Sequence, residues 1–203
     1  MADVITDSAV RSLKGPNQIF YEWKDYLLFV KSYFAIRGIL NPVVVEIGVQ
    51  NGRQKPHYQK FLDAVHIGID ISDKFCKPDI LGDSHAPETM ARLKAMLATR
   101  KINLLFIDAC HTYEDALSEY ESYGPLSKDI IAFHDIRHIL GIGKLWHDIN
   151  YKERFNKNRV SFSIGGWGGG WCELGIGVIV KHPRSELNDV VEEFQRTRKE
   201  SLD

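Results

Sequence analysis

The sequence has few of the features that mark secreted, membrane-bound or nucleic-acid-binding proteins. Its three cysteines, an odd number at wide spacing, argue against a disulfide framework and predict reduced thiols. The 26 basic and 27 acidic side chains nearly cancel, so the net charge offers no long-range attraction for a polyanion. Residues 1–13 lack the basic start and apolar run of a signal peptide, and no stretch reaches the roughly 20 apolar residues of a membrane span. We therefore predict a cytoplasmic protein with a small-molecule partner, and no nucleic acid or membrane as a partner.

The length and the hydrophobic content are typical of a folded protein with one core. With 203 residues, of which 44% are hydrophobic, the chain can bury one substantial core. It contains no internal repeat, low-complexity tract or linker. We predict a single domain over residues 1–203, with an N-terminal helical segment (1–40), a core (41–182) and a C-terminal helix and tail (183–203).

The apolar residues of the core alternate between two patterns. Four short, unbroken apolar runs are typical of strands buried on both faces, namely 43–47, 66–71, 102–107 and 130–133. The stretches between them have helical composition, at 54–63, 87–100 and 113–123. Strands and helices in this order imply right-handed crossovers and a parallel sheet with helices on both sides.

The N-terminal segment predicts one long amphipathic helix. Apolar and aromatic residues recur every three to four positions over residues 19–39. Its aromatic face, with Phe20, Trp23, Tyr33 and Phe34, either covers the sheet or makes a dimer contact, which would give a homo-oligomer. The sequence does not choose between the two.

The C-terminal part has a different sequence pattern from the core. Residues 160–165 and 175–182 flank a Gly- and Trp-rich connection and predict two antiparallel strands. Residues 185–199 then predict a helix whose apolar stripe covers the sheet, formed by Leu187, Val190, Val191 and Phe194.

Glycine and polar residues follow the predicted strands, where open parallel sheets bind their ligands. After the first strand, Gly48 and Gly52 permit a tight turn and close approach of a ligand to the backbone. The second strand ends at Asp70, whose carboxylate can accept hydrogen bonds from both ribose hydroxyls. Asp83 and Ser84 can meet an adenine edge, although either could instead cap a helix. Residues 46–52 lack the three closely spaced glycines of an NAD-dependent dehydrogenase.

Acidic and histidine side chains follow the next two strands. Asp108 comes directly after 102–107, with His111 three residues on, and His134 and Asp135 follow 130–133. If these strands are neighbours, their ends lie about 5 Å apart, so Asp108, His134 and Asp135 can converge on a metal ion. Carboxylates favour Mg²⁺ or Ca²⁺, and an imidazole ligand shifts the preference towards Mn²⁺, Fe²⁺ or Zn²⁺. These residues could also have purely structural roles. Asp108 could cap the next helix, and a histidine beside a core strand could be hydrogen-bonded to a backbone carbonyl.

Together with the order of the elements, these motifs resemble the class I S-adenosylmethionine-dependent methyltransferases over residues 41–182. The resemblance implies an α/β fold, a Rossmann-like three-layer α/β/α sandwich with a mostly parallel seven-stranded sheet and a C-terminal antiparallel hairpin. It also implies which residues would bind S-adenosylmethionine. These are Glu46, Gly48 and Gly52 on the methionine side, Asp70 at the ribose, Asp83 and Ser84 at the adenine, and Asp108 beside them.

Residues 104–113 and 131–136 further resemble the metal-dependent small-molecule O-methyltransferases, a subgroup that includes macrolide-sugar methyltransferases and cephalosporin-hydroxylase-like proteins. The resemblance implies Mg or Mn at Asp108, His134 and Asp135. His111 stands where catechol-type relatives carry a lysine base, so it is the first candidate base and His134 the second. The metal would lower the pKa of the acceptor hydroxyl and a neutral histidine would take its proton. We expect methyl transfer to a hydroxyl of a small molecule, a sugar or a phenol.

Two segments near the C-terminus are candidates for acceptor binding. Residues 137–159 include His138, Trp146 and His147, which could line an acceptor pocket, although a Trp at helical spacing is usually part of a core. The glycine-rich residues 166–171 are either a lid or a plain hairpin loop.

Two other functions remain open on the sequence alone. Histidines and carboxylates at 108–111 and 134–135 would also suit a non-haem iron, oxygen-dependent hydroxylase-like enzyme. Alternatively, the fold could be a nucleoside-binding scaffold without catalysis. The loop after the first strand is compatible with the scaffold hypothesis. Gln50 and Arg53 stand where the methyltransferases that it resembles commonly have glycine and small residues.

Overall fold

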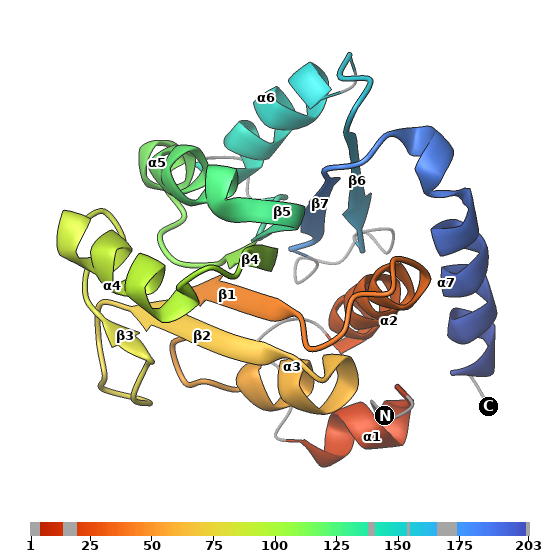
Figure 1. Cartoon of the computed structure of the whole chain (residues 1–203), viewed down its shortest axis with the longest axis horizontal. Helices are drawn as coiled ribbons and strands as arrows, with labels where there is room; N and C mark the ends of the chain where they lie inside the picture. Colours follow the sequence, from red (N-terminus) through yellow and green to blue (C-terminus); the bar gives the residue numbers. More distant parts are fainter. Residues whose placement is uncertain (1–4, 14–19, 138–140, 154, 166–173, 202–203) are drawn as a thin grey trace.

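The apolar runs of the sequence form one seven-stranded sheet in a computed structural model that describes residues 5–13, 20–137, 141–153, 155–165 and 174–201. The strand order is β3-β2-β1-β4-β5-β7-β6 (Figure 1). The strands are β1 (Val43–Ile47), β2 (Val65–Asp70), β3 (Ile80–Leu81), β4 (Ile102–Ile107), β5 (Ser127–His134), β6 (Val160–Ile164) and β7 (Ile176–Val180). β1 to β5 pair in parallel, whereas β7 is antiparallel to both β5 and β6. The predicted sheet with its closing antiparallel pair is confirmed.

Helices cover both faces of this sheet, which makes the predicted three-layer arrangement (Figure 1). One face packs against α1 (Asp7–Ser12), α2 (Phe20–Ile36), α3 (Lys55–Leu62) and α7 (Asn188–Glu200). The other packs against α4 (Pro87–Leu97), α5 (Tyr113–Tyr123) and α6 (Ile142–Glu153). Two short 3₁₀ turns, η1 (Gly124–Leu126) and η2 (Arg184–Glu186), precede β5 and α7.

The structure differs from the predicted elements in a few places. The sequence pattern located neither β3, which is two residues long, nor the helices α1 and α6. The predicted C-terminal helix begins as the 3₁₀ turn η2 and continues as α7. Val190 is fully buried on α7, but the predicted stripe residue Val191 is 44% exposed. Val191 follows Val190 directly, so the rotation of about 100° per residue turns it away from the sheet.

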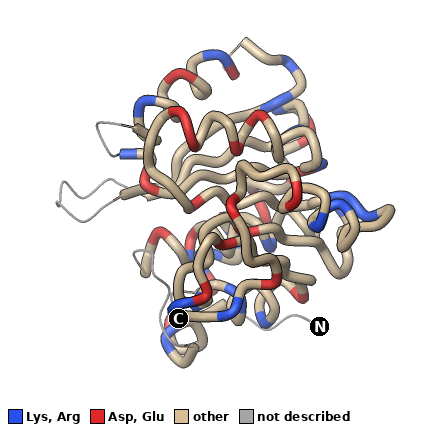
Figure 2. The backbone as a smooth tube through the Cα atoms, turned by 90° about the vertical axis from the view of Figure 1, so that its left-hand side faces the viewer, with Lys and Arg blue, Asp and Glu red and all other residues tan. Residues whose placement is uncertain are grey.

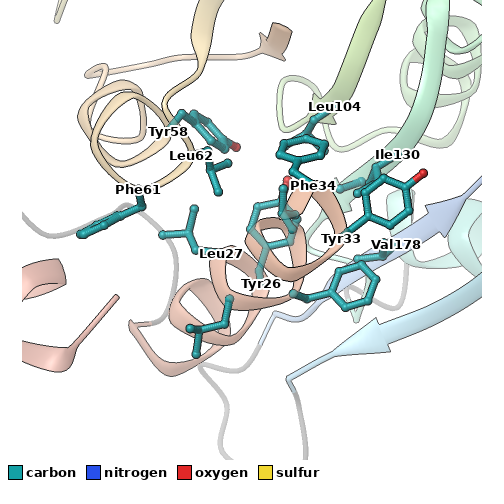
Figure 3. Packing of buried hydrophobic residues seen from close by; sticks show 14 of the residues in the cluster. Tyr26, Leu27, Tyr33, Phe34, Tyr58, Phe61, Leu62, Leu104, Ile130 and Val178 are labelled. Atoms are coloured by element: carbon teal, nitrogen blue, oxygen red, sulfur yellow. The ribbon is translucent and has the colours of Figure 1, made fainter. Parts of the chain in front are cut away.

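The aromatic face of α2 covers the sheet, which decides one alternative that the sequence left open. Trp23 is fully buried and makes edge-to-face contacts with Tyr58 of α3 and Phe106 of β4, at centroid distances of 5.4 and 5.8 Å. Figure 3 shows Tyr26, Leu27, Tyr33 and Phe34 of this helix among side chains from α3 and the strands. These contacts make α2 the main hydrophobic cover on its side of the sheet.

Charged residues of both signs are distributed over the elements in the view of Figure 2. Among the described residues, no helix combines the length and apolar composition that crossing a bilayer requires. Cys76 and Cys110 are free thiols, and Cys172 lies outside the described residues.

We expect Trp23→Ala to lower the free energy of unfolding by about 3–5 kcal/mol, because it removes a large buried ring and leaves a cavity. The matched control is Tyr21→Ala on the same helix, where the ring is 64% exposed and a change below about 1 kcal/mol is expected. Urea unfolding followed by circular dichroism measures both. Equal effects of the two substitutions would show that α2 does not anchor the core in this way.

Candidate functional site

A cavity of about 640 Å³ lies beyond the carboxyl ends of the parallel strands. Residues that follow β1 to β5 line it, as expected for the ligand site of an open parallel sheet. Of the predicted site residues, the cavity lining includes Gly48, Asp70, Asp83, Ser84, Asp108, His111, His134 and Asp135. They belong to two sets on either side of β1, because Asp70, Asp83 and Ser84 follow β2 and β3, whereas Asp108 and Asp135 follow β4 and β5.

Gly48 brings the loop after β1 against the end of β4. Its amide donates a hydrogen bond to the Ile69 carbonyl at 2.9 Å, and its φ of +88° lies in the region that favours glycine. A Cβ atom on Gly48 would overlap the carbonyl oxygen of Asp108. Glycine at this position is therefore required both by the turn and by the approach of the two strand ends.

Asp70 ties the same loop to the end of β2. One carboxylate oxygen accepts a hydrogen bond from the Gln50 amide at 2.8 Å, and the other accepts one from the Ser72 amide at 2.9 Å. Gln50 has a φ of +44°, so the loop takes a left-handed turn where the family often has glycine. The Asp70 carboxylate is thus held in position at the wall of the cavity.

Two of the residues predicted for the cofactor loop do not line the cavity. Glu46 is fully buried, and its Oε2 lies 2.7 Å from Nε2 of His66, whose ring stacks on Tyr58 of α3. Burial raises the pKa of the Glu46 carboxyl. Gly52 faces the Cys76 side chain. The sequence placed Glu46 at the right strand end, but the alternation of side chains along β1 directs it to the α3 face.

Ser84, which follows β3, and Glu119 of α5 form a hydrogen-bonded pair at the wall of the cavity. Ser84 Oγ donates to Oε1 of Glu119 at 2.7 Å, and the Tyr123 hydroxyl donates to the Ser84 carbonyl at 2.6 Å. Glu119 lines the cavity although its side chain is only 1% exposed, and burial raises its pKa to about 7.

Glu119 is absent from the predicted site. The available signal was its place on α5, where it shares a buried stripe with Ala116 and Tyr123 at helical spacing. An acidic residue on an apolar stripe is unusual, because a buried charge needs a partner.

Asp108, His111 and Asp135 come together at the other end of the cavity. Each offers one ligand atom, and these atoms lie within 4.8 Å of one another. The parallel register of β4 and β5 pairs Ile107 with Phe133, so the residues that follow them start side by side. Asp135 has a left-handed φ of +57°, which interrupts the alternation of the strand and lets it approach Asp108 together with its neighbour His134.

His134 lies behind the two carboxylates. Its Nδ1 is 3.0 Å from Asp108 Oδ1 and 2.9 Å from Asp135 Oδ1. Burial lowers the pKa of His134, but the two carboxylates outweigh burial and raise it to about 10. The predicted convergence of Asp108, His134 and Asp135 is therefore present, and His111 joins the two carboxylates as a further candidate ligand. The sequence could not show which of the two imidazoles is the more exposed, because it does not say which way each imidazole points.

The backbone of His111 is held between two helices. Thr112 caps α5 by accepting a hydrogen bond from the Asp115 amide at 3.1 Å. The carbonyl of His111 accepts a hydrogen bond from the Ile142 amide at 3.1 Å, at the start of α6. Gly141 packs so closely that a Cβ atom there would overlap this carbonyl. His111 Nε2 lies 3.2 Å from Asp135 Oδ2 as a result of this placement.

The predicted acceptor-pocket residues of α6 do not line this cavity. Trp146 is 5% exposed, packs over Gly177 of β7 and donates its indole N–H to Ser163 Oγ at 3.1 Å. The His147 side chain is 80% exposed to solvent. Of the two alternatives for Trp146, the structure shows the core position that its helical spacing indicates. His138 and the glycine-rich residues 166–171 lie outside the described residues.

Comparison with known proteins gives matches at the level of structure. No protein-family model matches the sequence, and no curated protein matches it. The solved structures that match include the MycE methyltransferase of the mycinamycin biosynthetic pathway, in complex with Mg, SAH and mycinamycin VI. It is 14% identical over 87% of this chain and 53% of its own, with a TM-score of 0.61. This chain thus spans about half the length of MycE.

Two further solved structures match over most of their own length. The O-methyltransferase from Bacillus cereus in complex with SAH is 12% identical, over 87% of this chain and 98% of its own, with a TM-score of 0.55. Cofactor-bound Rv0187 from MTB is 12% identical, over 87% of this chain and 88% of its own, with a TM-score of 0.57. The chain therefore has the Rossmann-like fold of these methyltransferases.

The buried Glu119 carboxyl predicts a pH-dependent stability. In the folded protein its pKa is raised from 4.5 to about 7, so the folded state holds this proton more tightly than the unfolded chain does. Stability is then lost as the pH rises through this window and stays low above it. Between about pH 5 and about pH 8, we expect the wild type to lose about 2 kcal/mol more stability than Glu119→Gln.

Urea unfolding at the two pH values measures this difference. The matched control is Glu121→Gln, the same change at an exposed position of the same helix, which should follow the wild type. Parallel pH curves for the wild type and Glu119→Gln would contradict a buried proton at this carboxyl.

Proposed function

We propose that this protein is an S-adenosylmethionine-dependent methyltransferase that transfers a methyl group to a hydroxyl of a small molecule, with the help of a divalent metal. The observation that carries the proposal is one cavity with two different polar ends. The first end has a glycine turn and a strand-end carboxylate at Gly48 and Asp70, and the second has two carboxylates and a histidine within 4.8 Å. MycE, which shares this fold, binds Mg, SAH and mycinamycin VI.

The first end fits a nucleoside. The two oxygens of Asp70 each accept one backbone hydrogen bond, which leaves further lone pairs for ribose hydroxyls. Ser84 and Asp83 supply polar groups for the base. The bare backbone of Gly48 lies against the end of β4, so a sulfonium bound at this loop would lie next to Asp108.

The second end fits a divalent metal. Two carboxylates and an imidazole are donors suited to Mg²⁺ or Mn²⁺. When bound, such a cation would lower the pKa of the acceptor hydroxyl and orient its oxygen for in-line attack on the methyl carbon. His134 would hold the Asp108 and Asp135 carboxylates in place from behind.

His111 is the proposed base. It lies beside Asp135 with 45% of its side chain exposed, so a neutral imidazole there can accept the hydroxyl proton of an acceptor in the cavity. Its Nε2 could instead complete the ligand set of the metal.

The geometry argues against both alternatives that the sequence left open. Non-haem iron oxygenases typically use two histidines and one carboxylate as iron ligands. This cluster instead has two carboxylates and His111, because Nδ1 of His134 already contacts both carboxylates. The scaffold alternative rested on the altered loop after β1. Gln50 nevertheless adopts the left-handed turn there, and Gly48 keeps its close approach to Asp108.

Calorimetric titration with S-adenosylmethionine and with S-adenosylhomocysteine tests the nucleoside site. We expect binding that Asp70→Ala weakens by about tenfold or more, because the ribose hydrogen bonds are lost. Asp73→Ala, an exposed carboxylate three residues on, is the control and should bind like the wild type. Absence of binding of either compound, with and without Mg²⁺, would remove the proposed function.

Titration with Mn²⁺ tests the metal site. Asp108→Asn and Asp135→Asn should each reduce the affinity by roughly tenfold or more, because each removes a charged ligand. The control, Asp63→Asn, makes the same change at an exposed turn whose left-handed backbone asparagine tolerates. The proposed metal site would be wrong if Asp63→Asn and the two site variants bound Mn²⁺ equally.

His111→Ala separates the two roles of this histidine. As a base, its loss should lower the rate of methyl transfer by about 10²–10⁴-fold while Mn²⁺ affinity stays unchanged. A fall in Mn²⁺ affinity that matches that of Asp108→Asn would instead make His111 a ligand.

A further inference from the structure

The Ser84–Glu119 pair has no role in the methyl-transfer chemistry, although both residues line the cavity. Glu119 is 1% exposed, and its Oε2 has no hydrogen-bond partner in the part of the chain that the structure describes. A carboxyl group with an unpaired buried oxygen costs stability, so its presence on an otherwise apolar helix stripe needs a functional explanation. Its Oε1 accepts a hydrogen bond from the hydroxyl of Ser84, at 2.7 Å.

This contact determines how Ser84 can interact with a ligand. A serine hydroxyl has one hydrogen to donate and two lone pairs to accept with. An ionised Glu119 holds that hydrogen in a charge-assisted bond, which leaves Ser84 Oγ as a hydrogen-bond acceptor. A neutral Glu119 holds the hydrogen more weakly, so the hydroxyl can turn and donate to a ligand instead.

We propose that Glu119, acting through Ser84, selects the 6-amino edge of an adenine over the 6-oxo edge of a hypoxanthine at this end of the cavity. An amino group donates hydrogen bonds and matches Ser84 as an acceptor. A 6-oxo group accepts and matches Ser84 as a donor. This inference rests on the proposed nucleoside site and assigns Glu119 as a positioning residue for Ser84.

Selectivity should therefore depend on pH. Burial raises the pKa of Glu119 to about 7, so the carboxyl changes charge near neutral pH. The charged groups that face it are Asp83 and His85 from the loop before α4, and Asp115 from α5 itself. His85 opposes the rise in pKa, and the two aspartates add to it.

The experiment compares two ligands, S-adenosylhomocysteine and its deaminated analogue S-inosylhomocysteine, by calorimetry from about pH 6 to about pH 8.5. In the wild type, the affinity ratio should rise with pH, from near unity to about tenfold in favour of the amino compound. The rise follows ionisation of Glu119.

Two variants assign the effect to the pair. Glu119→Gln should bind both ligands with a ratio that is close to one and independent of pH, because an amide can either accept from Ser84 or donate to it. Ser84→Ala should also lose the selectivity, since the group that contacts the base is gone. Glu121→Gln, an exposed glutamate on the same helix, should keep the wild-type ratio at each pH.

Each contrary result is distinct. If the pH-dependent ratio persists in Glu119→Gln, another group such as His85 carries the proton and the inference is overturned. If Ser84→Ala keeps the selectivity, Glu119 does not act through Ser84. If both ligands bind the wild type with the same pH profile, the inference about Glu119 is wrong but the proposed nucleoside site stands. If neither binds at any pH, the proposed nucleoside site fails with it. If Glu119→Gln does not fold, Ser84→Ala still tests the pair, because its loss of selectivity is expected only if the base contacts Ser84 Oγ.

Discussion

Two carboxylates, Asp108 and Asp135, lie side by side at the ends of β4 and β5, and the site depends on what balances their charge. Like charges at this separation repel, and partial burial strengthens the repulsion. His134 offsets it from below, since one ring nitrogen lies within 3.0 Å of an oxygen from each carboxylate. Protonated His134 can stabilise the pair, and a divalent cation on the cavity side would do so from above. The cavity side of the pair is where the proposed metal would bind.

Hydrogen bonds of the backbone connect this pair to the loop after β1, where the nucleoside site is proposed. The Asp108 amide donates to the Ile47 carbonyl at 2.9 Å, one residue before the glycine that contacts the Asp108 carbonyl. Asp70 then holds the next part of that loop through the Gln50 amide. Strand pairing of β1 with both β2 and β4 thus sets the distance between the two ends of the cavity. A cofactor and an acceptor bound at these ends would be aligned by the sheet itself, which is rigid, and not by side chains that first have to order.

Three carboxyl groups around the site, those of Glu46, Glu119 and Asp70, have different hydrogen-bond partners. Glu46 is paired with His66 on the α3 face, where it supports the strand without reaching the cavity. Glu119 accepts a hydrogen bond from the Ser84 hydroxyl, and burial raises its pKa to about 7. Asp70 is held by backbone amides. Burial raises the pKa of both Glu46 and Glu119, and a hydrogen-bond partner opposes the rise in each case, His66 for Glu46 and Ser84 for Glu119.

The sequence by itself determined the order of the elements, the parallel sheet with its antiparallel end, and the strand ends that carry the candidate site residues. These follow from local signals, since apolar runs, helical spacing and glycine turns are set by neighbours in the chain. It also named Asp108 and Asp135 correctly as neighbours. Only the tertiary structure decided that His111 joins them, that His134 lies behind them and that Trp146 belongs to the core. It alone brought Glu119 to the cavity. The reason is physical: whether a side chain faces a ligand or a neighbour depends on strand register, helix rotation and close backbone contacts between segments far apart in the chain.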